Sequence, residues 1–227
     1  MATIPTAWAV VVAAGGGLRF GGYKQFAVLG GREVVDWSLG AACHNCTGTV
    51  LVVPESMVVS YQGRADRVIA GGETRTASVA AGLGAVPEEA EVVVVHDAAR
   101  PLAGEALWGQ VISAVLDGAD AAVPCLPVRD TIKQRGADGR LATLDRSLLV
   151  ASQTPQAFSA TALRAAHAAA AAEGKQATDD AALIESMGGR VVAVSGESSN
   201  LKLTEKLDLA VAEALLAAQS AAQLAAQ

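Results

Sequence analysis

The sequence carries too few basic residues for a protein that binds nucleic acid. Its 227 residues include 17 Lys and Arg against 23 Asp and Glu, which gives a formal net charge of -6 at pH 7. Nucleic acids and anionic membranes attract proteins with clustered positive charge. The composition therefore predicts neither a nucleic-acid partner nor a membrane partner. An anionic ligand would have to be met by a few local cations.

Long apolar runs and disulfide-forming cysteines are also missing. The apolar start, residues 1–12, is short and has no basic flank, so it resembles neither a signal peptide nor a spanning helix. The cysteines, Cys43, Cys46 and Cys125, are an odd number, which predicts free thiols in a reducing, cytoplasmic setting. The cluster around His44 lacks a second ligand pair, which favours ordinary packing over a zinc site.

The periodicity of the apolar residues predicts an α/β fold in one domain over residues 1–227. The chain is 52% hydrophobic, enough for one sizeable core. Short runs that are apolar at nearly every position suit strands buried on both faces, and they alternate with helical segments, as in a mostly parallel sheet wrapped by helices. Strands are expected at residues 8–13, 49–53, 92–96, 121–123 and 190–194, and helices at 34–42, 76–83, 107–116, 161–172 and 205–218.

Two later segments depart from this alternation. Residues 129–153 are polar, contain two glycines and lack a helical stripe, which predicts a hairpin or arm that projects from the domain. The run Thr178-Asp179-Asp180 predicts a helix start with Thr178 as its N-cap, and Gly188 marks the expected end of that helix.

The first predicted strand leads into a glycine-rich segment that suits a phosphate. Glycines there let backbone N–H groups turn toward an anion, and the nearby Arg19 and Lys24 could neutralise a triphosphate. The segment is not a Walker loop, and it lacks the third glycine and the downstream acid of the dinucleotide pattern. Taken alone, the pattern would also be compatible with a flexible loop that carries two solvated cations.

A second pair of glycines precedes the helix that carries Arg75 and Ser78. A backbone can approach a nucleobase closely at Gly71-Gly72, and the Ser78 hydroxyl could complete the hydrogen bonding. A plain junction between a loop and a helix would show the same pattern.

The third strand ends at Asp97, within His96-Asp97-Ala98-Ala99-Arg100-Pro101. Ligands bind at the carboxyl ends of strands in open α/β sheets, so Asp97 could hold Mg²⁺ on bound phosphates. The alternative is that Asp97 pairs with Arg100 or caps a helix. His96 is expected to be structural, because transfer to a substrate phosphate needs no general base.

Together these segments resemble the 2-C-methyl-D-erythritol 4-phosphate cytidylyltransferase family, which has a Rossmann-like nucleotidyltransferase fold. The resemblance spans nearly the whole chain, and several ordered motifs are far more specific than any one of them. The later motifs are Pro127-Val128-Arg129-Asp130-Thr131-Ile132-Lys133, Asp145-Arg146, Thr154-Pro155-Gln156, Thr178-Asp179-Asp180-Ala181 and Asn200-Leu201-Lys202-Leu203-Thr204.

The resemblance implies an enzyme that transfers CMP from CTP to the phosphate of 2-C-methyl-D-erythritol 4-phosphate, with Mg²⁺, and releases pyrophosphate in non-mevalonate isoprenoid biosynthesis. By similarity, Arg19 and Lys24 would grip the triphosphate, while Arg146 and Lys202 would hold the second substrate in line for attack. The nucleotide would be bound by Ala13, Ala14, Gly15, Gly16, Gly72, Ser78, Asp97 and Ala98, and the second substrate by Arg100, Thr131, Thr154, Thr178 and Thr204.

The resemblance also implies a homodimer, because the arm at about residues 128–152 crosses to a partner subunit in family members. Arg146 could then serve the neighbouring site. The sequence departs from the family pattern between Arg19 and Lys24, where the segment is short and Tyr23 replaces a proline. Because proline restricts φ, this loop is expected to be more mobile without nucleotide.

Three other functions remain open. A ribitol 5-phosphate cytidylyltransferase would share the glycine-rich segment, but its relatives commonly carry a hydroxyl residue in place of Ala98. A sugar 1-phosphate nucleotidyltransferase would use another base. A noncatalytic nucleotide-binding homologue would bind CTP without releasing pyrophosphate.

Overall fold

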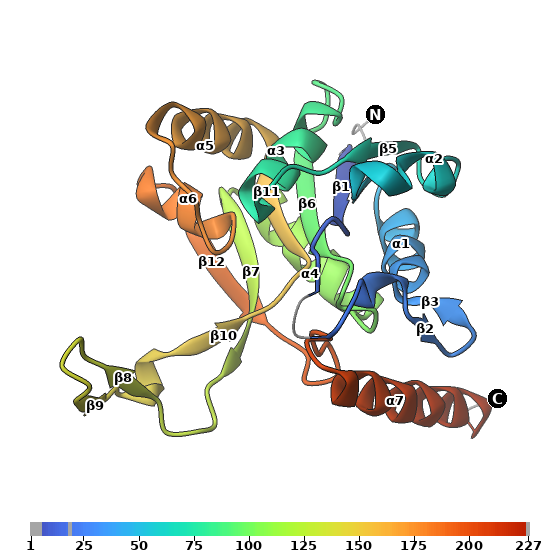
Figure 1. Ribbon diagram of the computed structural model, residues 1–227. Coiled ribbons are helices and arrows are strands. Elements are labelled where there is room, and N and C mark those ends of the chain that lie inside the picture. Colours follow the sequence, from blue (N-terminus) through green and yellow to red (C-terminus); the bar gives the residue numbers. More distant parts are fainter. Residues whose placement is uncertain (1–5, 18–19, 226–227) are drawn as a thin grey trace.

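The computed structural model describes residues 6–17 and 20–225. An eight-stranded sheet forms its centre (Figure 1), and the strands are β1 (Ala7–Val12), β4 (Gly48–Val53), β5 (Arg67–Ala70), β6 (Val92–Asp97), β7 (Ala121–Pro127), β10 (Val150–Ser152), β11 (Gln156–Ser159) and β12 (Val191–Ser195). They run in the order β10-β7-β11-β6-β1-β4-β5, and β12 also pairs with β7. β10 and β11 are antiparallel to their neighbours, and the other pairs are parallel. The predicted mostly parallel sheet is confirmed.

Helices cover both faces of the sheet. Successive side chains of a strand point to opposite faces, so Val11 joins one apolar cluster and Val10 joins the other. The first cluster lies against α1 (Val34–Asn45) and α4 (Glu105–Leu116), and the second lies against α3 (Arg75–Gly84), α5 (Ala160–Glu173) and α6 (Ala181–Ser186). Both faces are apolar, which explains why the strands lack a polar alternation in the sequence.

Two segments extend from this body, as Figure 1 shows. The arm contains β8 (Lys133–Arg135), β9 (Leu141–Thr143) and η3 (Arg146–Leu148). β8 and β9 pair as an antiparallel hairpin, which confirms the predicted arm. At the other end α7 (Lys206–Ala225) covers a small apolar cluster around Leu29 and Leu203. The remaining elements are η1 (Lys24–Phe26), β2 (Val28–Leu29), β3 (Arg32–Glu33), η2 (Glu55–Met57) and α2 (Val58–Tyr61).

The predicted start of α6 was wrong. The helix begins at Ala181 with Asp180 as its N-cap residue, so Thr178 lies outside it. The reason is that Asp179 takes the capping contact, because its Oδ1 accepts a hydrogen bond of 3.1 Å from the Ala182 N–H. The predicted end is confirmed, since the helix stops just before Gly188, which has φ +75°.

Within residues 6–17 and 20–225, no helix has the length and apolar character that crossing a membrane requires.

Candidate active site

A cavity of about 270 Å³ opens at the carboxyl-terminal edge of the sheet, where the loops after β1, β5 and β6 meet. This is the edge at which open α/β sheets bind ligands. Lys24 and Lys202 also line the cavity, although neither belongs to these three loops. Its lining residues are Val12, Ala13, Ala14, Gly15, Gly16, Gly17, Lys24, Gln25, Gly72, Glu73, Thr74, Arg75, Ser78, Asp97, Ala99 and Lys202.

The loop after β1 is fixed by a glycine turn and by a buried amide. Gly17 has φ +61°, and a Cβ there would lie 2.0 Å from the Gly22 carbonyl oxygen, so only glycine fits. Gln25 is 2% exposed, and its Nε2 donates to the carbonyl oxygens of Ala13 (2.6 Å) and Gly15 (2.9 Å). Gln25 therefore holds the backbone of the glycine-rich segment against the edge of the cavity.

The loop after β5 packs directly on the first loop. A Cβ on Gly71 would lie 2.3 Å from the Cβ of Ala14, so the close approach requires glycine. The Ser78 hydroxyl is buried, donates to the Thr74 carbonyl oxygen at 2.9 Å, and accepts from the Gly72 N–H at 3.2 Å. Ser78 thus shapes the loop that lines the cavity as well as facing the cavity itself.

The carboxylate of Asp97 lies between two cationic side chains of the site. Lys202 Nζ lies 2.5 Å from its Oδ2, and Arg75 Nε lies 3.6 Å from its Oδ1. Burial would raise the pKa of the Asp97 carboxyl, but Lys202 and Arg75 outweigh it and hold that pKa well below its usual range. The expected alternative pairing with Arg100 is not formed among the described residues. Arg100 donates instead to the carbonyl oxygens of Asn200 and Ser152.

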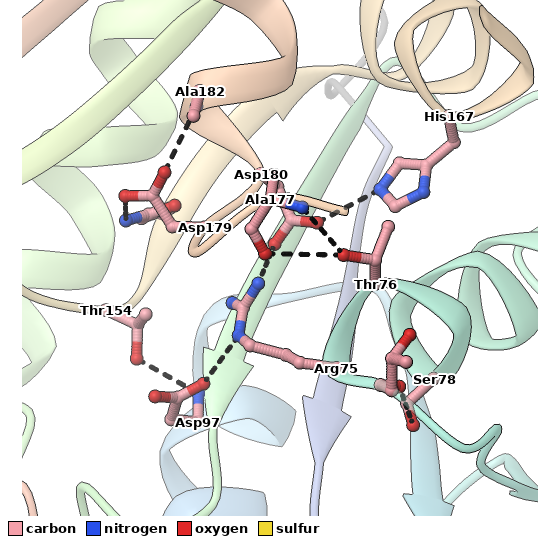
Figure 2. Close-up of polar contacts among 12 residues, drawn as sticks. Arg75, Thr76, Ser78, Asp97, Thr154, His167, Ala177, Asp179, Asp180 and Ala182 are labelled. Carbon is pink, nitrogen blue, oxygen red and sulfur yellow. Dashed lines mark hydrogen bonds and ion pairs between the residues drawn. The ribbon is translucent and has the colours of Figure 1, made fainter. Parts of the chain in front are cut away.

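Three hydrogen bonds in series fix the backbone around Asp97. The Asp97 N–H donates to Thr154 Oγ1 at 2.9 Å (Figure 2), and Thr154 Oγ1 lies 3.2 Å from His96 Nδ1. His96 Nε2 lies 3.1 Å from the Arg100 carbonyl oxygen, which can only accept. The network therefore assigns the proton to Nε2 and makes Nδ1 the acceptor for the Thr154 hydroxyl. His96 and Thr154 act here as supports of the strand end.

His96 predicts a loss of stability in acid. Burial lowers its pKa to about 4, whereas the ordinary value is 6.5. The unfolded chain takes up a proton as the pH falls through 6.5, but the folded chain stays neutral until about 4, so stability is lost across this window. The free energy of unfolding should fall by about 3 kcal/mol from this group between pH 7 and pH 4. Urea unfolding of the wild type and of His96→Gln, which cannot titrate, isolates the effect. Equal pH dependence in both proteins would contradict it.

The residues around Asp97 suit a metal that is shared with a nucleotide. No group of three or more His, Cys, Asp or Glu side chains with metal-site geometry occurs among residues 6–17 and 20–225. Asp97 and Glu73 are the carboxylates that line the cavity. Mg²⁺ is commonly held by one or two carboxylates together with substrate phosphates and water. Asp97 therefore fits a metal that arrives with a triphosphate rather than one held by the protein alone.

The structure brings together most of the predicted nucleotide residues. Ala13, Ala14, Gly15, Gly16, Gly72, Ser78 and Asp97 all line the cavity with Lys24 and Lys202, whereas Arg19 lies outside the described residues. Ala98 is fully buried and is not among the residues that line the cavity. The cavity lining does not include the other described candidates, which are Arg100, Thr131, Arg146, Thr154, Thr178 and Thr204.

Those remaining candidates are spread over separate elements. Arg146 and Thr131 are exposed on the arm, where Arg146 Nη1 donates to the Arg129 carbonyl oxygen at 2.6 Å. Thr178 is exposed before α6. The Thr204 hydroxyl donates to the Lys202 carbonyl oxygen at 3.0 Å. Within the described chain, Thr178 and Thr204 do not form a pocket together with Arg146 and Thr131 of the arm.

Sequence reasoning did not assign a role to three residues that the site uses. Gln25 clamps the glycine-rich loop, Arg75 pairs with Asp97, and Asp180 holds Arg75 at 2.8 Å. Gln25 directly follows Lys24, which was the available signal for it. No local signal links Arg75 to Asp180, because 105 positions separate them.

The chain is similar to a known protein family and to several of its members. The sequence profile of the family "2-C-methyl-D-erythritol 4-phosphate cytidylyltransferase" matches residues 7–218. A protein of that name from Rhodococcus opacus is 43% identical over 92% of this chain and 94% of its own length. A bifunctional enzyme IspD/IspF from Nitratidesulfovibrio vulgaris is 41% identical over 91% of this chain, which spans only 57% of that relative.

Solved structures agree in fold. The 2-C-methyl-D-erythritol 4-phosphate cytidylyltransferase of Thermus thermophilus superposes with a TM-score of 0.80 at 35% identity, covering 91% of this chain and 97% of that one. A 4-diphosphocytidyl-2C-methyl-D-erythritol synthase from Anaerococcus prevotii gives a TM-score of 0.83 at 30% identity, with 93% and 98% covered. The predicted nucleotidyltransferase fold is confirmed.

Proposed function

Because the chain belongs to the 2-C-methyl-D-erythritol 4-phosphate cytidylyltransferase family, a family of cytidylyltransferases of isoprenoid biosynthesis, we propose that it transfers CMP from CTP to the phosphate of 2-C-methyl-D-erythritol 4-phosphate. The observation that carries this proposal is the cavity in which Lys24, Lys202 and Asp97 converge beside the glycine-rich loop. Both substrates are anionic and soluble, which fits a cytoplasmic location.

The reaction joins two anions, so positioning and charge compensation supply the catalysis. A phosphate oxygen of the second substrate attacks the α-phosphorus of CTP, a P–O bond forms, and the bond to the pyrophosphate breaks. The attacking oxygen already carries charge and needs no general base. Lys24, with Arg19, would offset charge at the triphosphate, and Lys202 would hold the incoming phosphate. Mg²⁺ held by Asp97 would neutralise charge on the triphosphate when bound.

Two residues that the family resemblance assigns to the second substrate do not line the cavity of the single chain. Arg146 and Thr131 lie on the arm, away from the cavity lining. The arm also exposes Leu141, Leu148 and Val150, whose side chains would be covered by a partner. These features support a homodimer in which the arm of one subunit carries Arg146 to the site of the other.

Mixing two inactive variants tests the arm's role. Lys24→Ala and Arg146→Ala are each expected to be nearly inactive, but a mixed dimer would contain one site with neither substitution. Random mixing of subunits should therefore restore about a quarter of wild-type activity, because half of the dimers are mixed and each has one intact site. Subunits are exchanged by denaturation and refolding, and pyrophosphate release is measured. No recovery in the mixture would contradict a site shared between subunits.

The proposed substrate is tested against ribitol 5-phosphate. The purified protein is incubated with CTP and Mg²⁺ and either phosphate ester, and pyrophosphate release is followed. We expect release with 2-C-methyl-D-erythritol 4-phosphate. Activity only with ribitol 5-phosphate would move the function to that substrate, and CTP binding without release with either ester would indicate a noncatalytic homologue.

A further inference from the structure

A buried polar network connects α5 to Asp97, as Figure 2 shows. The Asp180 side chain is 1% exposed, its Oδ1 lies 3.0 Å from His167 Nε2, and its Oδ2 accepts from Arg75 Nη1 at 2.8 Å. Arg75 Nε in turn lies 3.6 Å from Asp97 Oδ1. The network thus runs from His167 on α5, through Asp180 at the start of α6 and Arg75 on α3, to the carboxyl end of β6.

The two contacts of Arg75 differ in kind. The 2.8 Å contact with Asp180 is a charge-assisted hydrogen bond, whereas the 3.6 Å contact with Asp97 is too long for a hydrogen bond. Asp180 therefore holds the guanidinium by one nitrogen and keeps it just short of Asp97. A guanidinium freed from Asp180 could turn toward Asp97 and hydrogen-bond to its Oδ1, because arginine forms strong charge-assisted hydrogen bonds with carboxylates.

Neighbouring hydrogen bonds hold Asp180 in place. The segment that carries it is joined to α3 by Thr76, whose hydroxyl lies 3.3 Å from the Ala177 nitrogen and 3.4 Å from the Ala177 oxygen. His167, which is 6% exposed, occupies the second Asp180 oxygen. A buried carboxylate is costly unless its charge is paired, and an apolar side chain would fill this space at lower cost. The site therefore retains a charge that packing alone does not require.

We propose that Asp180, fixed by His167, is a positioning residue that restrains Arg75 and so keeps Asp97 available to a metal-bound nucleotide. This inference rests on the proposed function, because CTP with Mg²⁺ is the ligand that Asp97 would meet. Without the restraint, Arg75 would close over Asp97 and compete with the metal for its oxygens.

Equilibrium binding of CTP at a series of Mg²⁺ concentrations tests the restraint without measuring turnover. Asp180→Asn keeps the shape of the side chain and removes its charge, so the half-saturating Mg²⁺ concentration should rise about tenfold. The matched control is Asp179→Asn, which can retain the capping contact with the Ala182 N–H and should change that concentration by less than about twofold.

A double variant separates restraint from general destabilisation. If Asp180 acts only by holding Arg75, the charge of Asp180 should have no effect once Arg75 is replaced by a neutral residue. The Arg75→Gln/Asp180→Asn variant should therefore show the same Mg²⁺ dependence as Arg75→Gln alone. Losses that simply add in the double variant would overturn the inference, because they would show that Asp180 acts independently of Arg75.

His167→Phe provides a second route, which also serves where Asp180→Asn does not fold. It removes the Nε2 contact but leaves the Asp180 charge, so a smaller rise in the half-saturating Mg²⁺ concentration is expected. If Asp180→Asn folds and its half-saturating Mg²⁺ concentration equals that of the wild type, this inference is overturned and the proposed function is not. If Asp180→Asn does not fold, the same result in His167→Phe overturns the inference. A wild-type protein that binds no CTP would overturn the proposed function and this inference together.

Discussion

Lys24→Ala is expected to lower kcat/KM for cytidylyl transfer by about a thousandfold, the scale seen when a preorganised donor to transition-state charge is removed. Lys24 stands at the start of η1 and faces the cavity beside the glycine-rich loop. Charge builds on the α-phosphate and on the departing pyrophosphate during attack, so an ammonium there stabilises the transition state more than the ground state.

The measurement is steady-state pyrophosphate release with both substrates varied. Lys175→Ala is the control, because Lys175 is an exposed lysine just after α5 and does not line the cavity. Its kcat/KM should match that of the wild type, and Lys24→Arg should recover part of the loss. A Lys24→Ala enzyme within tenfold of wild type would remove Lys24 from the catalytic machinery.

Lys202→Ala should lower kcat/KM for the methylerythritol substrate by about a hundredfold or more. Lys202 is 42% exposed, so its ammonium is open to an incoming phosphate even while it contacts Asp97. The substitution removes that charge, which together with Arg75 and Arg100 lowers the pKa of Asp97. The KM for 2-C-methyl-D-erythritol 4-phosphate should therefore rise more than the KM for CTP.

The matched control for this variant is Lys206→Ala, which removes an exposed lysine from the first turn of α7. Activity close to that of the wild type is expected for the control. Should Lys202→Ala raise only the KM for CTP, Lys202 would belong to the nucleotide site and not to the second substrate.

The central strands and the glycine loop could be predicted because their signals are local. β1 and β6 are apolar at almost every position, and residues with distinctive chemistry lie where they end, because β1 leads into the glycine-rich segment and β6 ends at Asp97. β11 was not predicted, because its four residues follow the arm directly and include Gln156, a polar residue in a buried strand. Its place between β6 and β7 depends on tertiary pairing, which no short window records.

The site divides in the same way. Lys24 and Asp97 were predicted from motifs that lie next to strands, but the two ion pairs of Arg75 join residues that are far apart in the sequence. The start of α6 shows a further limit, because Thr178 and Asp179 both have side chains that can cap a helix, and only the folded geometry gives the contact with the Ala182 N–H to Asp179. Composition and spacing predicted the edge of the sheet at which the cavity lies but not the ion pairs among its charged side chains.

The most direct test of the account follows the α-phosphate of CTP. The wild-type enzyme is incubated with Mg²⁺, 2-C-methyl-D-erythritol 4-phosphate and CTP labelled at the α-phosphorus, and the products are separated. We expect the label to move into 4-diphosphocytidyl-2-C-methyl-D-erythritol while unlabelled pyrophosphate is released in equal amount. Label that stays in CTP, or that appears as free CMP, would contradict it.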